Sequence, residues 1–180
     1  DLATLSDGTK IGAPKPLKTK LKKLQRLSKS LSRKQKGSAN RAKAKTKLSR
    51  LHYQIGCIRK DFLHKLTTQL ITNYDTIAIE DLNVKGMVKN RKLARSINDL
   101  GFYELKRQLI YKANQWGKTI KSVDRFFPSS KTCSVCYNKV ETLPLSMRTW
   151  QCLHCQTTHD RDINASLNIL HHANKVLTLA

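Results

Sequence analysis

Four cysteines in the second half of the sequence have the spacing of a metal site. Cys133 and Cys136 form one CxxC pair, and Cys152 and Cys155 form a second pair after a gap of 15 residues. Four thiolates at this spacing can surround one Zn²⁺ ion tetrahedrally and leave no coordination position open, which predicts a structural rather than a catalytic zinc. The alternatives are a redox-active CxxC pair or buried structural cysteines, and the presence of two pairs disfavours both.

The residues around the two pairs qualify this prediction. Knuckles of this kind favour glycine directly after the second cysteine, where φ is often positive, but Tyr137 and Gln156 stand there, so we expect a strained or altered turn. His154 is disfavoured as a substitute ligand. The fifth cysteine, Cys57, has no ligand partner nearby in the sequence and is predicted to be a buried thiol. An odd number of cysteines arranged for metal binding indicates a reducing compartment.

Acidic side chains at two distant places could hold a catalytic metal. Glu80 ends an apolar run and is followed by Asp81, and Asp160 and Asp162 begin the last predicted helix. Carboxylates at a strand end and a helix start can converge on Mg²⁺, and two such ions would activate water and stabilise the leaving oxygen in phosphodiester cleavage. Taken singly, a helix N-cap and a solvated strand end explain these acids better.

The positive charge is concentrated in the first third of the chain. There are 35 Lys and Arg residues against 12 Asp and Glu residues, a formal net charge of +23, and the segment Gly8–Lys60 holds 18 of the basic residues and no acidic one. Such a segment repels itself unless a polyanion lies against it, and nucleic acid is the first candidate because each neutralised phosphate releases counterions. Composition alone leaves a solvated helix face, a disordered arm and a membrane-surface helix open. The residues predicted to contact nucleic acid are Lys22, Lys23, Arg26, Lys29, Arg33, Lys34, Arg41 and Lys43.

Helical periodicity narrows these alternatives. Leucines recur every three or four residues in this segment, and a second apolar series that includes Ile58 follows. This predicts a helical hairpin of Leu17–Lys34 and Asn40–Ile71, with a turn at Gly37-Ser38 and the basic side chains projecting outward as a ridge. An ordered hairpin disfavours disorder, and the scarcity of aromatic residues among the lysines disfavours a membrane-surface helix.

The remaining sequence alternates strand and helix patterns. The expected elements are a short hairpin of Leu2–Leu5 and Thr9–Gly12, strands at Thr76–Glu80 and Thr119–Val123, a capping box at Ser96–Asp99 before a helix at Phe102–Trp116, and a last helix from Asp160 to Leu179. Strands interleaved with helices indicate an α/β fold with a mixed sheet. No apolar run reaches the ~20 residues of a membrane helix and the N-terminus has no secretory-signal pattern, so we expect no membrane partner and a cytoplasmic, nucleoid-associated protein.

Several longer motifs together resemble the TnpB family, the OrfB products of small insertion sequences that are often labelled transposases. Residues 76–87 closely resemble the second catalytic motif of these proteins. Residues 94–99, 124–133 and 160–170 match further family segments in the same order. The resemblance spans essentially the whole chain.

This resemblance implies a fold and an activity. The implied fold is a RuvC-like, RNase H-type α/β domain with a zinc ribbon inserted before its last helix. The implied domains are a partial RuvC-like domain at 1–125 with the basic hairpin at 17–71, a zinc ribbon at 126–159, and the last RuvC-like helix at 160–180. The implied activity is RNA-guided cleavage of DNA with Mg²⁺ by a mobile-element protein, with DNA and a guide RNA as partners.

The resemblance also assigns roles to two acids. Carried over by motif, Glu80 is the second metal-binding acid and Asp162 the third. Asp162 is preferred over Asp160 because the family's acid stands two residues before the helix asparagine, here Asn164.

The start of the chain departs from the family pattern. The family's first catalytic Asp lies in an Asp-Leu-Gly segment that ends a central strand, whereas this sequence begins Asp1-Leu2-Ala3. We therefore expect Asp1 to belong to the second strand and the first central strand to be missing, which would leave a truncated, inactive copy. The alternatives are a non-catalytic module that binds nucleic acid and, less favoured, a zinc-ribbon adaptor that binds protein. No sequence feature indicates an oligomeric state.

Overall fold

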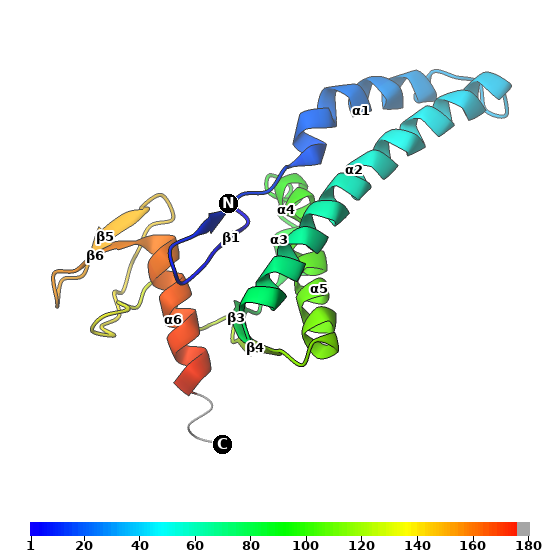
Figure 1. The fold of residues 1–180 in the computed structure, drawn as a ribbon. Coiled ribbons are helices and arrows are strands. Elements are labelled where there is room, and N and C mark those ends of the chain that lie inside the picture. The colour runs from blue at the N-terminus through cyan, green and yellow to red at the C-terminus, as the bar shows by residue number, and fades with distance from the viewer. Residues whose placement is uncertain (176–180) are drawn as a thin grey trace. The chain divides into compact units, whose positions relative to one another are not determined.

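The computed structural model describes residues 1–175, which fall into two compact units (Figure 1). The first unit contains residues 1–12, residues 73–83 and the chain from residue 113 onward, and the second contains residues 13–72 and 84–112. All the described strands belong to the first unit, and most of the helices belong to the second.

A helical hairpin forms most of the second unit. Helix α1 (Pro16–Ser32) and helix α2 (Ala39–Asn73) are joined by a turn in which Gly37 has a φ of +84°, which confirms the predicted hairpin. The leucines of α1 are half-buried, and the basic residues between them are exposed apart from Lys20, which is half-buried. Arg41 at the start of α2 donates through Nη1 to the carbonyl oxygens of Leu31 and Lys34, each at 3.0 Å. It thereby satisfies carbonyls that the end of α1 leaves without helical partners.

The buried side of α2 differs in part from the predicted stripe. Leu51 and Ile55 are buried as expected, but Ile58 is 38% exposed. Cys57, predicted to be buried, is exposed. Each helical residue turns by about 100°, so a position two residues after Ile55 lies on the opposite side of the helix from it. Although α2 has 35 residues, no helix within residues 1–175 combines the length and apolar character needed to cross a bilayer.

A buried carboxylate joins three helices of the second unit. Asp99, in helix α4 (Ala94–Leu100), is 3% exposed, and its two carboxylate oxygens accept hydrogen bonds from the backbone amides of Leu17 and Lys18 at 3.0 and 2.9 Å. Arg59 of α2 pairs with the same carboxylate at 3.3 Å and donates through Nε to the Asp99 carbonyl oxygen at 3.1 Å. Asp99 therefore caps the N-terminus of α1 from a distant part of the sequence.

The predicted capping box at Ser96–Asp99 is wrong. Ser96 lies inside α4, and within the described part of the chain no side chain caps that helix. The acid of the pattern does cap a helix, but the helix is α1. The short helix α3 (Val84–Met87) precedes α4, and helix α5 (Phe102–Gln115) follows it. Gly117, with a φ of +63°, stands just beyond the end of α5, where glycine commonly ends a helix.

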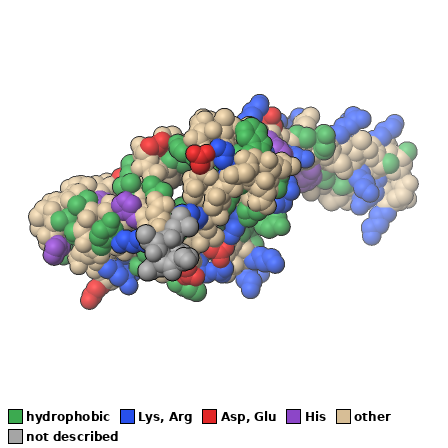
Figure 2. Space-filling model, turned by 60° about the horizontal axis from the view of Figure 1, so that its bottom comes forward, with side chains coloured by type: hydrophobic (Ala, Val, Ile, Leu, Met, Phe, Trp, Pro, Cys, Tyr) green, Lys and Arg blue, Asp and Glu red, His purple; other side chains and the backbone are tan. Residues whose placement is uncertain are grey.

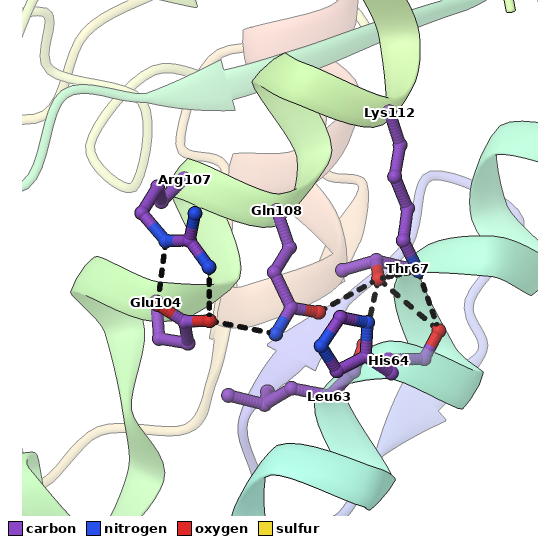
Figure 3. A network of polar contacts seen from close by, with 7 residues as sticks. All are labelled: Leu63, His64, Thr67, Glu104, Arg107, Gln108 and Lys112. Atoms are coloured by element: carbon purple, nitrogen blue, oxygen red, sulfur yellow. Dashed lines mark hydrogen bonds and ion pairs between the residues drawn. The ribbon is translucent and has the colours of Figure 1, made fainter. Parts of the chain in front are cut away.

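Polar side chains connect α2 to α5 in the interior of the second unit (Figure 3). Thr67 and Gln108 are fully buried and hydrogen-bond to each other at 3.0 Å. Lys112 Nζ donates to Thr67 Oγ1 at 2.8 Å, to Thr68 Oγ1 at 2.7 Å and to the His64 carbonyl oxygen at 2.8 Å. All three ammonium protons have acceptors, but these are neutral oxygens, and burial lowers the pKa of Lys112.

An ion pair on α5 continues this network. Arg107 binds the Glu104 carboxylate through two hydrogen bonds of 2.8 and 2.7 Å, and Gln108 donates to the same carboxylate at 2.9 Å (Figure 3). The hydrogen bonds from Arg107 hold the pKa of Glu104 at about 2. A chain of polar contacts thus runs from the α5 surface to the α2 backbone.

The strands of the first unit pair in three two-stranded sheets. β1 (Ala3–Thr4) and β2 (Lys10–Ile11) form the predicted antiparallel hairpin with shorter strands, β3 (Thr76–Glu80) and β4 (Thr119–Val123) form a parallel pair, and β5 (Thr149–Gln151) and β6 (Thr158–Asp160) form an antiparallel pair. β3 and β4 have the bounds predicted from the sequence. No strand pairing within residues 1–175 joins the three sheets, so the predicted mixed sheet is divided.

Helix α6 (Arg161–Lys175) connects these sheets by packing against β1, β3, β4 and β6. Ser166 Oγ donates to the Leu5 carbonyl oxygen at 3.1 Å, and Lys121 Nζ of β4 donates to the Ala173 carbonyl oxygen at 3.2 Å. The predicted helix continued to Leu179, and residues 176–180 lie outside the described residues. The first unit is therefore a mixed α/β unit organised by its last helix.

We expect Asp99→Ala to lower the free energy of unfolding by about 3 kcal/mol, because it leaves two α1 amides and the Arg59 guanidinium without an acceptor. Urea unfolding followed by circular dichroism measures this. The control is Asp61→Ala, which removes an exposed pair with Lys65 at 2.8 Å and should change stability by less than about 0.5 kcal/mol. Equal losses in the two variants would contradict the role of Asp99.

Candidate functional site

Two backbone knuckles bring the four predicted cysteines together. In the first, the Tyr137 amide donates to the Cys133 carbonyl oxygen at 2.9 Å, and the Cys133 amide donates to the Asn138 carbonyl oxygen at 2.9 Å. The second knuckle repeats both bonds at 2.9 Å, with Cys152 in the place of Cys133 and Gln156 in the place of Tyr137. Tyr137 and Gln156 each have a φ of +61°, so the expected strained turn is present at both positions.

The sulfur positions fit a tetrahedral metal ion. All four Sγ atoms lie within 4.8 Å of one another, and the Cys133–Cys155 and Cys136–Cys152 pairs are each 3.6 Å apart. A Zn–S bond of about 2.3 Å in a regular tetrahedron implies sulfur atoms about 3.8 Å apart. This cluster could therefore hold a metal such as zinc, and four cysteines would leave no position for a substrate.

Polar neighbours lie beside two of the four sulfur atoms. His159, 7% exposed, places Nε2 3.1 Å from Cys133 Sγ, where a protonated nitrogen would donate to the thiolate. The hydroxyl of Thr157 lies 3.3 Å from Cys155 Sγ, and its hydrogen bond is the main reason that the pKa of Cys155 falls to about 6. His154 is exposed, and it is not one of the residues whose ligand atoms converge in the cluster.

The ribbon around the cysteines has a small apolar core of its own. Leu143 and Trp150 are buried with Cys133 and Cys152, and Val140 packs against them. Trp150 lies on the His159 ring with centroids 4.9 Å apart. So few apolar residues bury little area, and a bound metal would supply most of the stability of such a module.

Two buried asparagines hold the ribbon to α6. The side chains of Asn164 and Asn168 donate to the backbone carbonyl oxygens of Ser129 and Thr132, and the side-chain oxygen Oδ1 of Asn164 accepts from the Ser134 amide at 2.9 Å. We did not predict this contact, or that of His159, from the sequence. The available signal was a pair of asparagines four residues apart inside a predicted helix, where asparagine is a poor helix former.

The two acids at the start of α6 have different surroundings. Asp160 Oδ1 accepts from the amides of Asp162 and Ile163 at 2.9 and 3.1 Å, and Asp160 Oδ2 binds Lys10 Nζ at 2.7 Å. The Lys10 hydrogen bond is the main cause of the lowered pKa of Asp160. The Asp162 side chain is 45% exposed and forms a loose ion pair, in which Arg148 Nη1 lies 4.0 Å from Asp162 Oδ1. Asp160 is thus committed to capping α6, whereas Asp162 is available to a ligand.

Glu80 and Asp81 also differ in their surroundings. Asp81 pairs with Arg125. Glu80 ends β3 opposite Val123, is partly buried, and has no ion pair within residues 1–175. Burial without a compensating cation raises the pKa of Glu80. Binding a cation would relieve that cost.

The structure places Asp162 in a hollow that does not include Glu80. The hollow is lined by Asp1, Lys10, Arg148, Asp160 and Asp162. Asp1 leads directly into the β1–β2 hairpin, as predicted, because the Leu2 amide donates to the Ile11 carbonyl oxygen at 2.7 Å. The structure therefore brings Asp1, rather than Glu80, beside Asp162.

The predicted basic ridge lies on α1 and the first half of α2. Figure 2 shows Lys and Arg side chains along this narrow end, with no acidic side chain visible there on the face drawn. Seven of the eight predicted contact residues are exposed. Arg41 is half-buried because its guanidinium binds the end of α1.

Comparison with known protein families gives two matches. Residues 1–91 match the family OrfB_IS605, described as "Probable transposase". Residues 102–169 match the Cas12f1-like TNB domain. The first match begins with the β1–β2 hairpin and ends beyond β3, and the second contains the cysteine knuckles and the start of α6.

Individual relatives extend these matches. A Streptomyces pristinaespiralis protein named "Putative RNA-guided DNA endonuclease" is 47% identical over 169 residues, which are 94% of this chain and 42% of that protein. The Escherichia coli protein "Putative RNA-guided DNA endonuclease InsQ" is 39% identical over 191 residues, covering 98% of this chain and 47% of InsQ. A Cas12f1 chain, solved by cryo-EM with sgRNA and target DNA, has a similar fold, with a TM-score of 0.55 at 19% identity over 83% of this chain and 42% of its own. This chain spans less than half the length of each.

We expect the four-cysteine cluster to bind one zinc ion per chain and Cys152→Ser to abolish stable binding, because three thiolates and a hydroxyl no longer form a closed set of ligands. Chelation and re-addition of Zn²⁺, followed by metal analysis, measure this. Cys57→Ser is the matched control and should retain the full zinc content, since Cys57 lies on the exposed side of α2. Equal zinc in Cys152→Ser and wild type would refute the assignment.

Proposed function

The chain belongs to the OrfB_IS605 family of probable transposases, and from this premise we propose that it is a mobile-element protein that binds DNA for RNA-guided, Mg²⁺-dependent cleavage. The observation that carries the proposal is the state of Glu80 and Asp162. Most acids with defined partners are bound to basic groups, as Asp81, Asp99 and Asp160 are, in a chain with a net charge of +23. Glu80 has no such partner among residues 1–175, and Asp162 has only a distant one.

Unpaired carboxylates in so basic a chain need a physical explanation. Asp162 has a loose pair with Arg148 at 4.0 Å, and Glu80 is partly buried without a paired cation among the described residues. Carboxylate oxygens are the ligands that Mg²⁺ prefers. When bound, Mg²⁺ would supply charge stabilisation at the cleaved phosphate and a more acidic water. Glu80 and Asp162 would hold such ions, and Asp160 would keep α6 in place.

The proposed fold of the first unit is RNase H-like with a RuvC-type arrangement. Its support is that α6 packs against β1 and also against β3 and β4, although no pairing within residues 1–175 joins these sheets. A strand between β1 and β3 would unite the two pairs into the predicted mixed sheet and satisfy the free edges of both. That strand is also where the resemblance puts the family's first catalytic Asp.

The basic ridge supports binding of DNA or guide RNA. Exposed lysines and arginines on α1 and α2 form phosphate contacts without reading bases, which gives affinity that depends on salt more than on sequence. The second candidate function, a non-catalytic nucleic-acid module, is favoured by the hollow at Asp162, which contains Lys10 and Arg148 and lacks Glu80. Measurement of divalent-ion binding at Glu80 and Asp162 distinguishes the catalytic from the non-catalytic candidate.

We expect Glu80→Gln and Asp162→Asn each to weaken Mn²⁺ binding by about tenfold, because each removes a charged ligand. Titration followed by electron paramagnetic resonance measures bound Mn²⁺. The control is Asp75→Asn, whose exposed carboxylate pairs with Lys118 in the same unit and should leave the affinity unchanged. Equal Mn²⁺ affinity in all four proteins would sink the catalytic proposal and favour the non-catalytic module.

Glu80→Gln should weaken Mn²⁺ binding, but in the absence of metal it should raise the free energy of unfolding. Because burial raises the pKa of Glu80 in the folded state, the native state holds this proton more tightly than the unfolded state. The tighter proton binding at Glu80 stabilises the folded state fully at pH values below the unfolded-state pKa of about 4.3. This stabilisation is lost as pH rises through the folded-state pKa. The glutamine variant should therefore be more stable than wild type at pH 7 and equal to it near pH 4 in urea unfolding. A less stable variant at pH 7 would contradict this.

We expect reversal of Lys22, Lys23, Arg26 and Lys29 to Glu to reduce the slope of log affinity against log salt by about 3 for DNA or RNA, since about four phosphate contacts disappear. Fluorescence anisotropy at several salt concentrations measures the slope. A control with the same charge change, Lys85, Lys89, Arg91 and Lys92 to Glu, should lose much less. Equal slopes in the two variants would show that net charge, rather than the ridge, determines binding.

A further inference from the structure

We infer that Asn164 and Asn168 are positioning residues that lock the zinc-ribbon loop to the start of α6, so that metal binding at the cysteines holds the Asp162 carboxylate in place. This rests on the proposed function insofar as Asp162 is taken as a metal-binding acid. The inferred coupling links two sites that lie in different motifs of the sequence.

Both asparagine side chains reach into the loop before the first cysteine. Asn168 Nδ2 donates to the carbonyl oxygens of Ser129 and Thr132 at 2.8 and 2.6 Å. Asn164 Nδ2 donates to the Thr132 carbonyl oxygen at 2.7 Å, with a longer contact to Ser129 at 3.5 Å. Asn164 Oδ1 accepts from the Ser134 amide at 2.9 Å. The two side chains thus hold three backbone groups of one loop.

Burial makes these bonds difficult to replace. Asn164 is 1% exposed and Asn168 is 2% exposed, although asparagine is usually a surface residue and a poor helix former. Both asparagines donate to the same two carbonyl oxygens, so removing both amides would leave these oxygens without a side-chain donor. Removing Asn164 alone would leave the Ser134 amide without its acceptor. The residues therefore fix the position of the loop rather than only filling space.

The hydrogen bonds extend into the knuckle itself. The Ser134 amide lies between Cys133 and Cys136, so Asn164 binds the same turn that presents two of the sulfur atoms. When the cysteines hold a metal, this turn is fixed at both ends. Without the metal, the ribbon keeps the small apolar core around Trp150, the β5–β6 pairing and the backbone bonds of the knuckles.

The helix carries this restraint to the acid. Asn164 and Asn168 are four residues apart and lie on one face of α6. Asp162 stands two residues before Asn164 in the first turn, so a fixed Asn164 also fixes the backbone from which the Asp162 carboxylate projects. Release of the loop would loosen the first turn of α6, which would keep the Asp160 cap with its Lys10 contact and the bonds of Arg161 to the carbonyl oxygens of Pro144 and Arg148.

Hydrogen exchange of the 180-residue chain tests this coupling. In wild type, removing zinc with a chelator should speed exchange of the backbone amides of residues 161–168 by about tenfold. In Asn164→Ala/Asn168→Ala these amides should already exchange fast with zinc bound, and chelation should add little. Asn174→Ala, in the last turn of the same helix, should behave as wild type. Zinc content should be equal in all of these proteins, because the four cysteines are intact.

Two results would overturn the inference. One is unchanged exchange of residues 161–168 in chelated wild type while residues 133–136 lose protection. The other is normal zinc-dependent protection of residues 161–168 in the double variant. If the double variant does not fold, Asn168→Ala keeps the Asn164 bonds and should show an intermediate zinc dependence, and full wild-type dependence would overturn the inference equally.

Mn²⁺ binding separates this inference from the proposed function. Zinc removal should weaken Mn²⁺ binding about tenfold in wild type and leave Mn²⁺ binding unchanged in the double variant Asn164→Ala/Asn168→Ala. A substitution that only lowered stability would not have this effect. If none of the proteins binds Mn²⁺, the proposed function fails, and the exchange experiment still decides whether the asparagines couple the ribbon to α6.

Discussion

Electrostatic self-repulsion is the constraint on which the rest of this structure depends. The chain has a net charge of +23 and 12 acidic residues, so repulsion between its basic groups opposes compact packing. The position of each carboxylate therefore affects which parts of the chain can pack closely. Asp99 lies where α1, α2 and α4 meet, and Asp160 lies where β2 meets α6. The basic residues of α1 and the first half of α2 have no such compensation nearby in the sequence, so these helices form the part of the protein that a polyanion can stabilise.

Buried polar contacts hold together elements that a larger apolar core would otherwise hold together. Aromatic residues make up 6% of the chain, and the interiors of both units contain hydrogen-bonded side chains. Thr67 and Gln108 connect α2 to α5, and Asn164 and Asn168 connect α6 to the ribbon. Because hydrogen bonds are directional and unmade buried groups are costly, such contacts specify one arrangement of two elements more narrowly than leucine packing does.

The local features of this fold could be predicted from the sequence, and the long-range ones could not. Apolar periodicity located the helical hairpin, β-branched runs located β3 and β4, and cysteine spacing located the metal cluster. Periodicity identifies an apolar stripe but not what covers it, so the exposure of Cys57 and Ile58 was missed. A capping pattern identifies an acid suited to a helix end but not which helix, so Asp99 was assigned to the wrong one. The partners of Asn164 lie about 30 residues away, and spacing carries no sign of them.

Asp160 and Asp162 show why the site needs the structure as well as the sequence. Both are acids at the start of a helix, and composition or helix preference cannot separate them. Asp160 ends β6, caps α6 and binds Lys10, so one side chain joins the ribbon, the helix and the first hairpin. That commitment leaves Asp162, two residues further along, as the carboxylate open to a ligand. Since the ribbon passes directly into α6 at this point, the acid proposed to bind Mg²⁺ lies where a displacement of the ribbon would be transmitted first.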